Sequence, residues 1–102
     1  MRKKRAKLPP VHPGQVLKTI LEDAGITANT LALALRVPAN RLTEILNERR
    51  SISADTALRL ARYFGTSAQM CMNLQARFDL ETAEDSPARR IESEVQPMRK
   101  AS

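Results

Sequence analysis

Apolar residues recur at helical spacing in several short segments of this chain, and polar or small residues separate these segments. The first segment lies between Pro13 and Gly25, since proline suits the first turn of a helix and glycine suits its C-terminal end. Thr27 can cap a second helix with its hydroxyl group, and Ser53 can cap the fourth. The apolar positions of the first four predicted helices are Val16, Leu17, Ile20, Leu21 and Ala24, then Leu31, Ala32 and Leu35, then Leu42, Ile45 and Leu46, then Ala57, Leu58, Leu60, Ala61 and Phe64.

A fifth helix is predicted to open at Ser67, with Met70, Leu74 and Phe78 at four-residue intervals. After Leu80 the composition shifts to Glu, Asp, Ser, Pro and Arg, which cannot bury enough apolar surface to offset the entropy of ordering. We therefore expect an all-α fold, a five-helix domain over residues 13–80. A flexible, disordered basic arm is expected over residues 1–12. A charged, disordered tail is expected over residues 81–102, with a short continuation of the fifth helix as the alternative at its start.

Residues 27–47 carry the most informative pattern of the chain. The second helix ends at a short break over residues 36–38, and a third helix follows from about Pro38 to Glu48. Two short helices joined in this way are typical of a helix-turn-helix motif, whose second helix can enter the major groove of DNA. The positions on the outer side of this third helix are Asn40, Thr43, Glu44 and Asn47. Asn can pair with an adenine edge, Thr can contact a thymine methyl group, and Glu can accept a hydrogen bond from cytosine.

Charge adds candidates for contact with the DNA backbone. The chain has 17 Lys+Arg against 11 Asp+Glu, but five of the basic residues fall within the first seven positions, Arg2, Lys3, Lys4, Arg5 and Lys7. The centre of the chain is therefore nearly neutral, with local arginine clusters. Arg41, Arg49 and Arg50 flank the third helix and are expected to contact phosphates, and Thr27 is included because it opens the preceding helix.

Other functional classes lack their characteristic residues. Cys71 is the single cysteine, so it can form neither an intrachain disulfide nor a cysteine-rich metal site. His12, the single histidine, is assigned a local capping or packing role. No Gly-rich phosphate loop, carboxylate pair or nucleophile motif is present, so we expect neither an enzyme nor a cofactor. No apolar run follows the basic start or approaches the roughly 20 residues of a membrane span, which predicts a cytoplasmic protein with no membrane partner.

Four blocks of the sequence together resemble the HigA-type antitoxins of the Xre-like helix-turn-helix group. These blocks are His12–Leu17, Arg41–Asn47, Ser53–Ser67 and Asn73–Gln75. The resemblance covers about residues 12–80 and implies a lambda-repressor-like fold. It also implies a homodimer that binds a palindromic operator in its own promoter and sequesters a cognate small ribonuclease toxin. The residues expected at the dimer interface are Met70, Cys71, Leu74 and Phe78.

The chain departs from this family's pattern at several positions. Arg36 stands where glycine is usual, which costs roughly 1 kcal/mol if the backbone is left-handed there. Ala28 and Ala39 replace polar residues that can touch DNA, and residues 70–72 replace an aromatic pair and a leucine. Together with the acidic Glu44, these changes leave two alternatives open. One is an interaction module that captures a toxin but binds DNA poorly, and the other is a helix-turn-helix regulator without a toxin.

Overall fold

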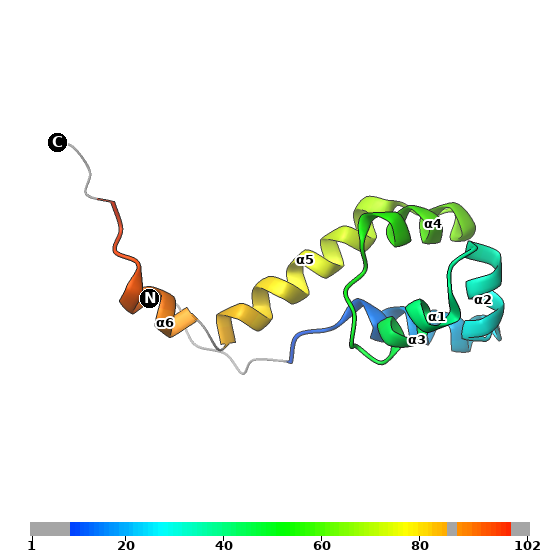
Figure 1. The fold of residues 1–102 in the computed structure, drawn as a ribbon, viewed down its shortest axis with the longest axis horizontal. Helices are drawn as coiled ribbons and strands as arrows, with labels where there is room; N and C mark the ends of the chain where they lie inside the picture. The colour runs from blue at the N-terminus through cyan, green and yellow to red at the C-terminus, as the bar shows by residue number, and fades with distance from the viewer. Residues whose placement is uncertain (1–8, 86–87, 99–102) are drawn as a thin grey trace.

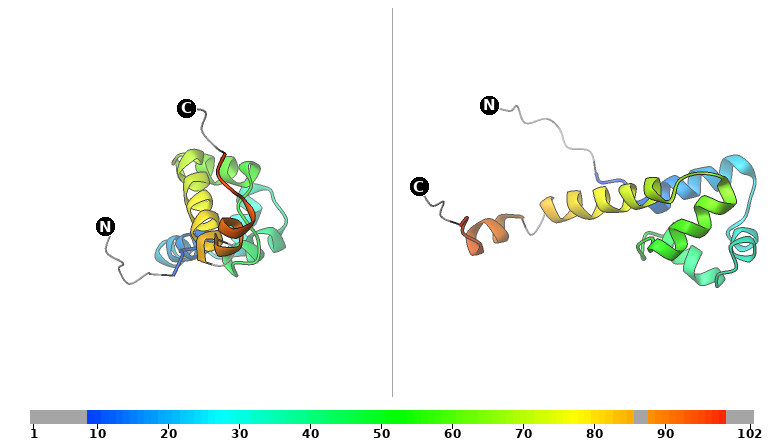
Figure 2. Two further views of the ribbon diagram at one scale, coloured as in Figure 1. Left: turned by 90° about the vertical axis from the view of Figure 1, so that its left-hand side faces the viewer. Right: turned by 90° about the horizontal axis from the view of Figure 1, so that it is seen from above.

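The computed structural model describes residues 9–85 and 88–98, and all regular structure within them is helical. Six helices follow one another (Figure 1): α1 (Pro13–Ala24), α2 (Ala28–Leu35), α3 (Ala39–Leu46), α4 (Ala54–Phe64), α5 (Ala68–Asp85) and α6 (Ala88–Glu94). The all-α fold predicted from the sequence is confirmed. The first four helices form a bundle, α5 packs on α1 and α4 and then extends beyond them, and α6 lies past its far end (Figures 1 and 2). In these residue ranges we find no helix with the length and apolarity to cross a membrane.

The helix ends follow the capping residues that the sequence indicates. Gly25 and Gly65 have φ angles of 69° and 71°, a left-handed backbone that glycine adopts without a side-chain clash. At the start of α2 the Thr27 hydroxyl accepts a hydrogen bond of 3.1 Å from the backbone N–H of Thr30. Ser53 caps α4 in the same way. Local interactions therefore explain where these helices begin and end.

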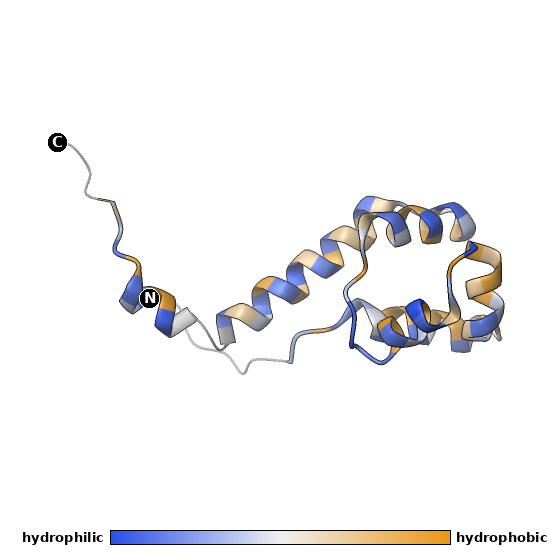
Figure 3. Cartoon of the chain, in the orientation of Figure 1, coloured by the Kyte–Doolittle hydropathy of each residue, from blue (hydrophilic) through white to orange (hydrophobic). Residues whose placement is uncertain are grey.

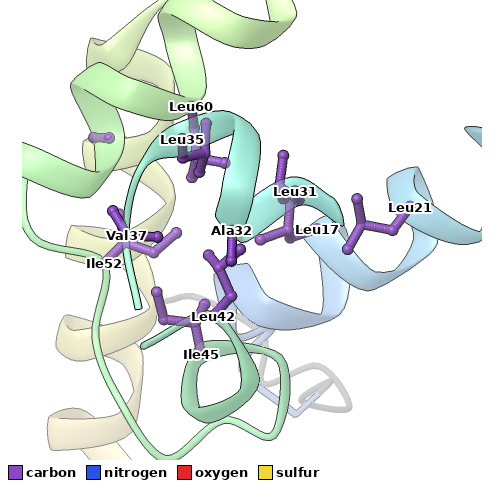
Figure 4. Close-up of a cluster of buried hydrophobic side chains, with 11 residues drawn as sticks. Leu17, Leu21, Leu31, Ala32, Leu35, Val37, Leu42, Ile45, Ile52 and Leu60 are labelled. Carbon is purple, nitrogen blue, oxygen red and sulfur yellow. The ribbon is translucent and has the colours of Figure 1, made fainter. Parts of the chain in front are cut away.

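One apolar core lies between the helices of the bundle (Figure 4). It consists of Leu17, Leu21, Leu31, Ala32, Leu35, Val37, Leu42, Ile45, Ile52, Ala57 and Leu60. Ala32 is 2% exposed and lies near Leu42, so its small side chain allows α2 and α3 to pack closely. Three residues of the predicted apolar faces are exposed instead of buried: Leu58 at 63%, Ile20 at 41%, and Ala24.

Two buried polar side chains connect α5 with the bundle. The His12 Nδ1 accepts a hydrogen bond of 2.8 Å from the backbone N–H of Gly14, and its ring meets the Phe78 ring edge-on, with centroids 4.8 Å apart. The capping and packing role predicted for His12 is therefore confirmed. Gln75 accepts a hydrogen bond of 2.8 Å from the backbone N–H of Ile52. This bond holds the connection between α3 and α4 against α5.

The C-terminal region requires a correction. The sequence predicts five helices and a disordered tail over residues 81–102, with a short continuation of the fifth helix as the alternative. The described residues contain this continuation, since α5 runs to Asp85, and also a sixth helix, α6, that begins at Ala88. Residues 95–98 have no regular structure. At the other end, residues 1–8 of the predicted basic arm lie outside the described residues.

Local helix propensity explains both the continuation of α5 and the additional helix α6. Ion pairs one helical turn apart join Arg77 to Glu81 at 3.2 Å and Arg90 to Glu94 at 3.0 Å. Ala, Glu and Arg are also good helix formers, so these segments need little burial to be helical. Figure 3 shows hydrophilic and hydrophobic residues mixed along both helices, and Ile91 is 51% exposed. The predicted lack of burial is thus correct for Ile91, but it does not prevent helix formation.

We predict that Gly14→Ala destabilises the fold by about 3 kcal/mol, because an added Cβ would overlap the backbone carbonyl of Ile45 in α3. Gly25→Ala is the control, since nothing lies within 4 Å of its Cβ position and only the left-handed backbone costs about 1 kcal/mol. Thermal unfolding followed by circular dichroism measures both losses. Equal destabilisation of the two variants would contradict the close contact of α1 with α3.

Candidate nucleic-acid interface

The helix α3 presents a polar face to solvent and an apolar face to the core. Asn40, Thr43 and Asn47 are exposed, whereas Leu42 and Ile45 are fully buried. The Thr43 hydroxyl donates a hydrogen bond of 3.1 Å to the backbone carbonyl one turn earlier, so its methyl group remains available for contact with another molecule. The structure therefore brings three of the predicted base-reading side chains together on one accessible surface.

Glu44 and Arg50, both predicted DNA contacts, form an ion pair with each other. Arg50 Nε lies 2.8 Å from Glu44 Oε1, and both side chains are partly exposed. Such a pair contributes little to stability. Its electrostatic effect is more relevant, because Arg50 offsets the repulsion that the Glu44 carboxylate would exert on phosphates. The guanidinium keeps further N–H groups that can donate to another acceptor.

Arg41, a third predicted contact, belongs to an ion-pair network at the junction of α2, α3 and α4. The Asp55 carboxylate lies 2.9 Å from Arg59 Nε and 3.1 Å from Arg41 Nη1. Arg59 also donates a hydrogen bond of 2.8 Å to the backbone carbonyl of Leu35 at the end of α2. The hydrogen bond from Arg59, assisted by Arg41, holds the pKa of the Asp55 carboxyl below its usual value. Asp55 thus links three helices, a role that the sequence alone indicates only as a charge at the start of α4.

The remaining predicted DNA contacts differ in how accessible their polar groups are. The Thr27 hydroxyl caps α2 and also donates a hydrogen bond of 2.9 Å to the Thr30 hydroxyl, so it is already engaged within its own helix. Arg49 is exposed just after α3, and it forms no ion pair with any residue that the structure describes.

The backbone is left-handed on both sides of α3 at residues other than glycine. Arg36 has a φ angle of 61° and Glu48 one of 62°. The Glu48 carboxylate accepts a hydrogen bond of 2.9 Å from Gln15 Nε2, which ties the end of α3 to α1. The left-handed backbone at Arg36 is the case considered from the sequence, whereas nothing in the sequence indicates the conformation of Glu48 or its contact with Gln15, 33 positions away.

The four α5 residues predicted at a subunit interface differ in exposure. Met70 is 58% exposed, whereas Cys71, Leu74 and Phe78 are partly buried. Phe78 packs on His12, and Cys71 packs against the core, where burial raises the pKa of its thiol. Of these four, Met70 therefore offers the most free surface. Among the residues described, no cluster of His, Cys, Asp or Glu is arranged to hold a metal ion.

Comparisons with known proteins agree with this geometry. Residues 17–70 match the family model for a helix-turn-helix, HTH_3. The chain is 48% identical over 79 residues to virulence-associated protein I of Dichelobacter nodosus, covering 76% of this chain and 73% of that protein. It is 33% identical over 78 residues to antitoxin HigA-1 of Vibrio cholerae serotype O1, covering 76% of this chain and 73% of that protein. A solved structure of the Pseudomonas aeruginosa antitoxin HigA with the higBA promoter superposes with a TM-score of 0.83 at 45% identity, covering 88% and 99% of the two chains.

We predict that Asp55→Asn lowers the melting temperature at about pH 7, because the neutral amide no longer attracts Arg41 and Arg59. Because the pKa of Asp55 is lower in the folded state, its carboxylate stabilises the fold at pH values above its unfolded-state pKa. This contribution is lost as the pH falls through the folded-state pKa, below about pH 4. The difference between wild type and variant should therefore hold from about pH 7 to about pH 5 and vanish at lower pH. Asp23→Asn, at an exposed carboxylate without an ion pair in the described part of the chain, is the control. A difference that stays constant into the acid range would refute this role.

Proposed function

The chain belongs to the Xre-like helix-turn-helix family and, within it, to the HigA-type antitoxins, and on this premise we propose that it is a DNA-binding antitoxin that represses its own promoter. In this proposal a homodimer binds a palindromic operator and also neutralises a cognate small ribonuclease toxin. The activity is placed in the cytoplasm, where operator DNA and messenger RNA are accessible. It includes no enzymatic step, in keeping with a family of DNA-binding regulators.

The observation that carries the proposal is the exposed polar face of a helix that is braced from behind. Asn40 and Thr43 on α3 and Asn47 directly after it are exposed, while the opposite face of the helix is buried in the core. Asn side chains can pair with adenine edges, and the free methyl group of Thr43 can meet a thymine methyl group. The major groove is wide enough to admit such a helix.

Phosphate contacts are proposed to come from residues that flank α3. Arg49 and Arg50 follow the helix after two intervening residues, and the five basic residues within positions 2–7 add positive charge. Arg50 would keep one N–H on Glu44 and turn others to a phosphate, which leaves a Glu44 oxygen free to accept from cytosine. Arg41 and Thr27 contribute less in this arrangement, because their polar groups already have partners within the chain.

The proposed dimer contact lies on α5. Met70 is its exposed centre, and Cys71, Leu74 and Phe78 lie on the same side of the helix at its partly buried border. The Pseudomonas aeruginosa relative, whose structure is described as antitoxin HigA with the higBA promoter, supports promoter binding by this chain. The antitoxin relatives support a toxin as the protein partner.

A second candidate function is an interaction module that captures the toxin and binds DNA only weakly. The observation in its favour is that Arg41 and Arg50, two of the expected phosphate contacts, are paired with Asp55 and Glu44. Salt dependence separates the two functions, since each phosphate neutralised adds about −0.9 to the slope of log K against log salt. A flat response together with toxin capture in a pull-down of co-expressed proteins would favour the interaction module.

We predict that Asn40→Ala and Arg49→Ala weaken DNA binding in different ways. Loss of Asn40 should remove about 1–3 kcal/mol of discrimination between the preferred duplex and one with its base pair changed. Loss of Arg49 should weaken binding to both duplexes equally and reduce the salt slope by about 0.9 for each chain bound. Fluorescence anisotropy on matched duplexes measures both effects. If Asn40→Ala weakens all sequences equally, Asn40 does not read a base.

We predict a footprint with dyad symmetry at the protein's own promoter, with half-site centres about 34–36 Å apart. Met70→Asp should shift the protein toward monomers in sedimentation, because it places charge at the centre of the proposed contact, and should shrink or abolish this footprint. Leu33→Asp is the control, since Leu33 is also an exposed apolar residue, 72% against 58% for Met70, but lies on α2. A footprint without symmetry, or one unaffected by Met70→Asp, would count against the dimer.

A further inference from the structure

Two residues with left-handed backbone bracket α3, and neither of them is glycine. Arg36 precedes the helix with φ 61°, and Glu48 follows it with φ 62°. Such a conformation is uncommon for residues with a Cβ, because the side chain crowds the backbone carbonyl. Glycine would form both turns at lower cost. Each of these two side chains is therefore expected to make an interaction that offsets this cost.

Glu48 has such an interaction within the chain. Its carboxylate accepts a hydrogen bond of 2.9 Å from Gln15 Nε2 on α1. The contact joins the end of α3 to the helix behind it, so the side chain of Glu48 has a structural use. Glu48 can be compared directly with Arg36, because the two residues share the same backbone conformation and differ in their side-chain interactions.

Arg36 has no comparable interaction. Its backbone N–H donates to the Leu33 carbonyl at 3.3 Å, but its side chain is exposed, and within residues 9–85 and 88–98 its guanidinium forms no hydrogen bond or ion pair. Five other arginines in these ranges are each paired with a carboxylate, namely Arg41, Arg50, Arg59, Arg77 and Arg90, whereas Arg49 and Arg62 form no ion pair with any described residue. Arg36 is thus a strained, charged and unengaged residue, a combination that points to a ligand outside the chain.

The position of Arg36 close to the start of α3 indicates the chemical class of this ligand. Three peptide units separate it from Ala39, the first residue of α3, so their Cα atoms are at most about 11 Å apart. The N-terminal residues of a recognition helix are those that contact base edges. A guanidinium at this end of α3 lies within reach of the phosphates that border a groove about 12 Å wide.

We infer that Arg36 binds a DNA phosphate at the edge of the groove that α3 enters, an inference that rests on the proposed DNA-binding function. The cost of its backbone conformation is offset in the complex by this charge-assisted contact. Arg36 is then a positioning residue, which sets the depth and register of α3 without reading a base itself.

The inference is tested by measuring how tightly the full-length chain binds a duplex that it has selected from a random-sequence pool. The salt concentration is varied from about 50 to about 200 mM. Arg36→Ala should reduce the salt slope by about 0.9 for each chain bound, and Arg36→Lys should retain it. Arg36→Gly should reduce the slope by the same amount while raising the melting temperature, because it also removes the strained side chain. A merely structural role for Arg36 cannot give weaker binding together with higher stability.

Arg90→Ala is the matched control, since it removes the same charge from α6, at the opposite end of the molecule from α3 (Figure 1). It should leave the salt slope unchanged. Three outcomes would overturn the assignment of Arg36 and leave the proposed function intact. They are a wild-type salt slope for Arg36→Ala, an equal drop in the slope for Arg90→Ala, and a loss of toxin capture by Arg36→Ala without a change in slope. Absence of salt-dependent DNA binding by the wild-type chain would overturn both.

Discussion

The orientation of α3 depends on its close contact with α1, where Gly14 lies against the backbone carbonyl of Ile45. At that point no side chain separates the two helices, so they approach as closely as backbone atoms allow. Leu42 and Ile45 are fully buried behind α3, and rotation of the helix would expose them. The direction in which Asn40, Thr43 and Asn47 point is therefore a consequence of the packing behind them.

The arginine residues near α3 differ in whether a carboxylate of the same chain engages them, and Arg50 is engaged by Glu44. Asp55 engages Arg41 and Arg59 in a network that joins three helices, and this network stabilises the arrangement of the motif. Arg36 and Arg49 are exposed and form no ion pair with the residues described. The central region is nearly neutral overall, but it presents positive charge beside α3 at Arg36 and Arg49. Local placement of charge matters more for this surface than the net charge of the whole chain.

Much of the fold could be predicted because its signals are local. Gly25, Gly65, Thr27 and Ser53 mark helix ends through hydrogen bonds and backbone preferences that involve residues a few positions away. The helix α6 is not predicted, for a related reason. Its segment buries little apolar surface, but helix propensity and the Arg90–Glu94 ion pair one turn apart are sufficient for it to be helical.

The amino-acid sequence by itself determined the all-helical class, the turn between α2 and α3, and which face of α3 is polar. Only the tertiary structure decided which polar groups are already engaged: Glu44 with Arg50, Arg41 with Asp55, and Glu48 with Gln15. The physical reason is distance along the chain. Helix periodicity and capping involve neighbours within about four residues, whereas these partners are 6, 14 and 33 positions apart and meet only after the helices have packed.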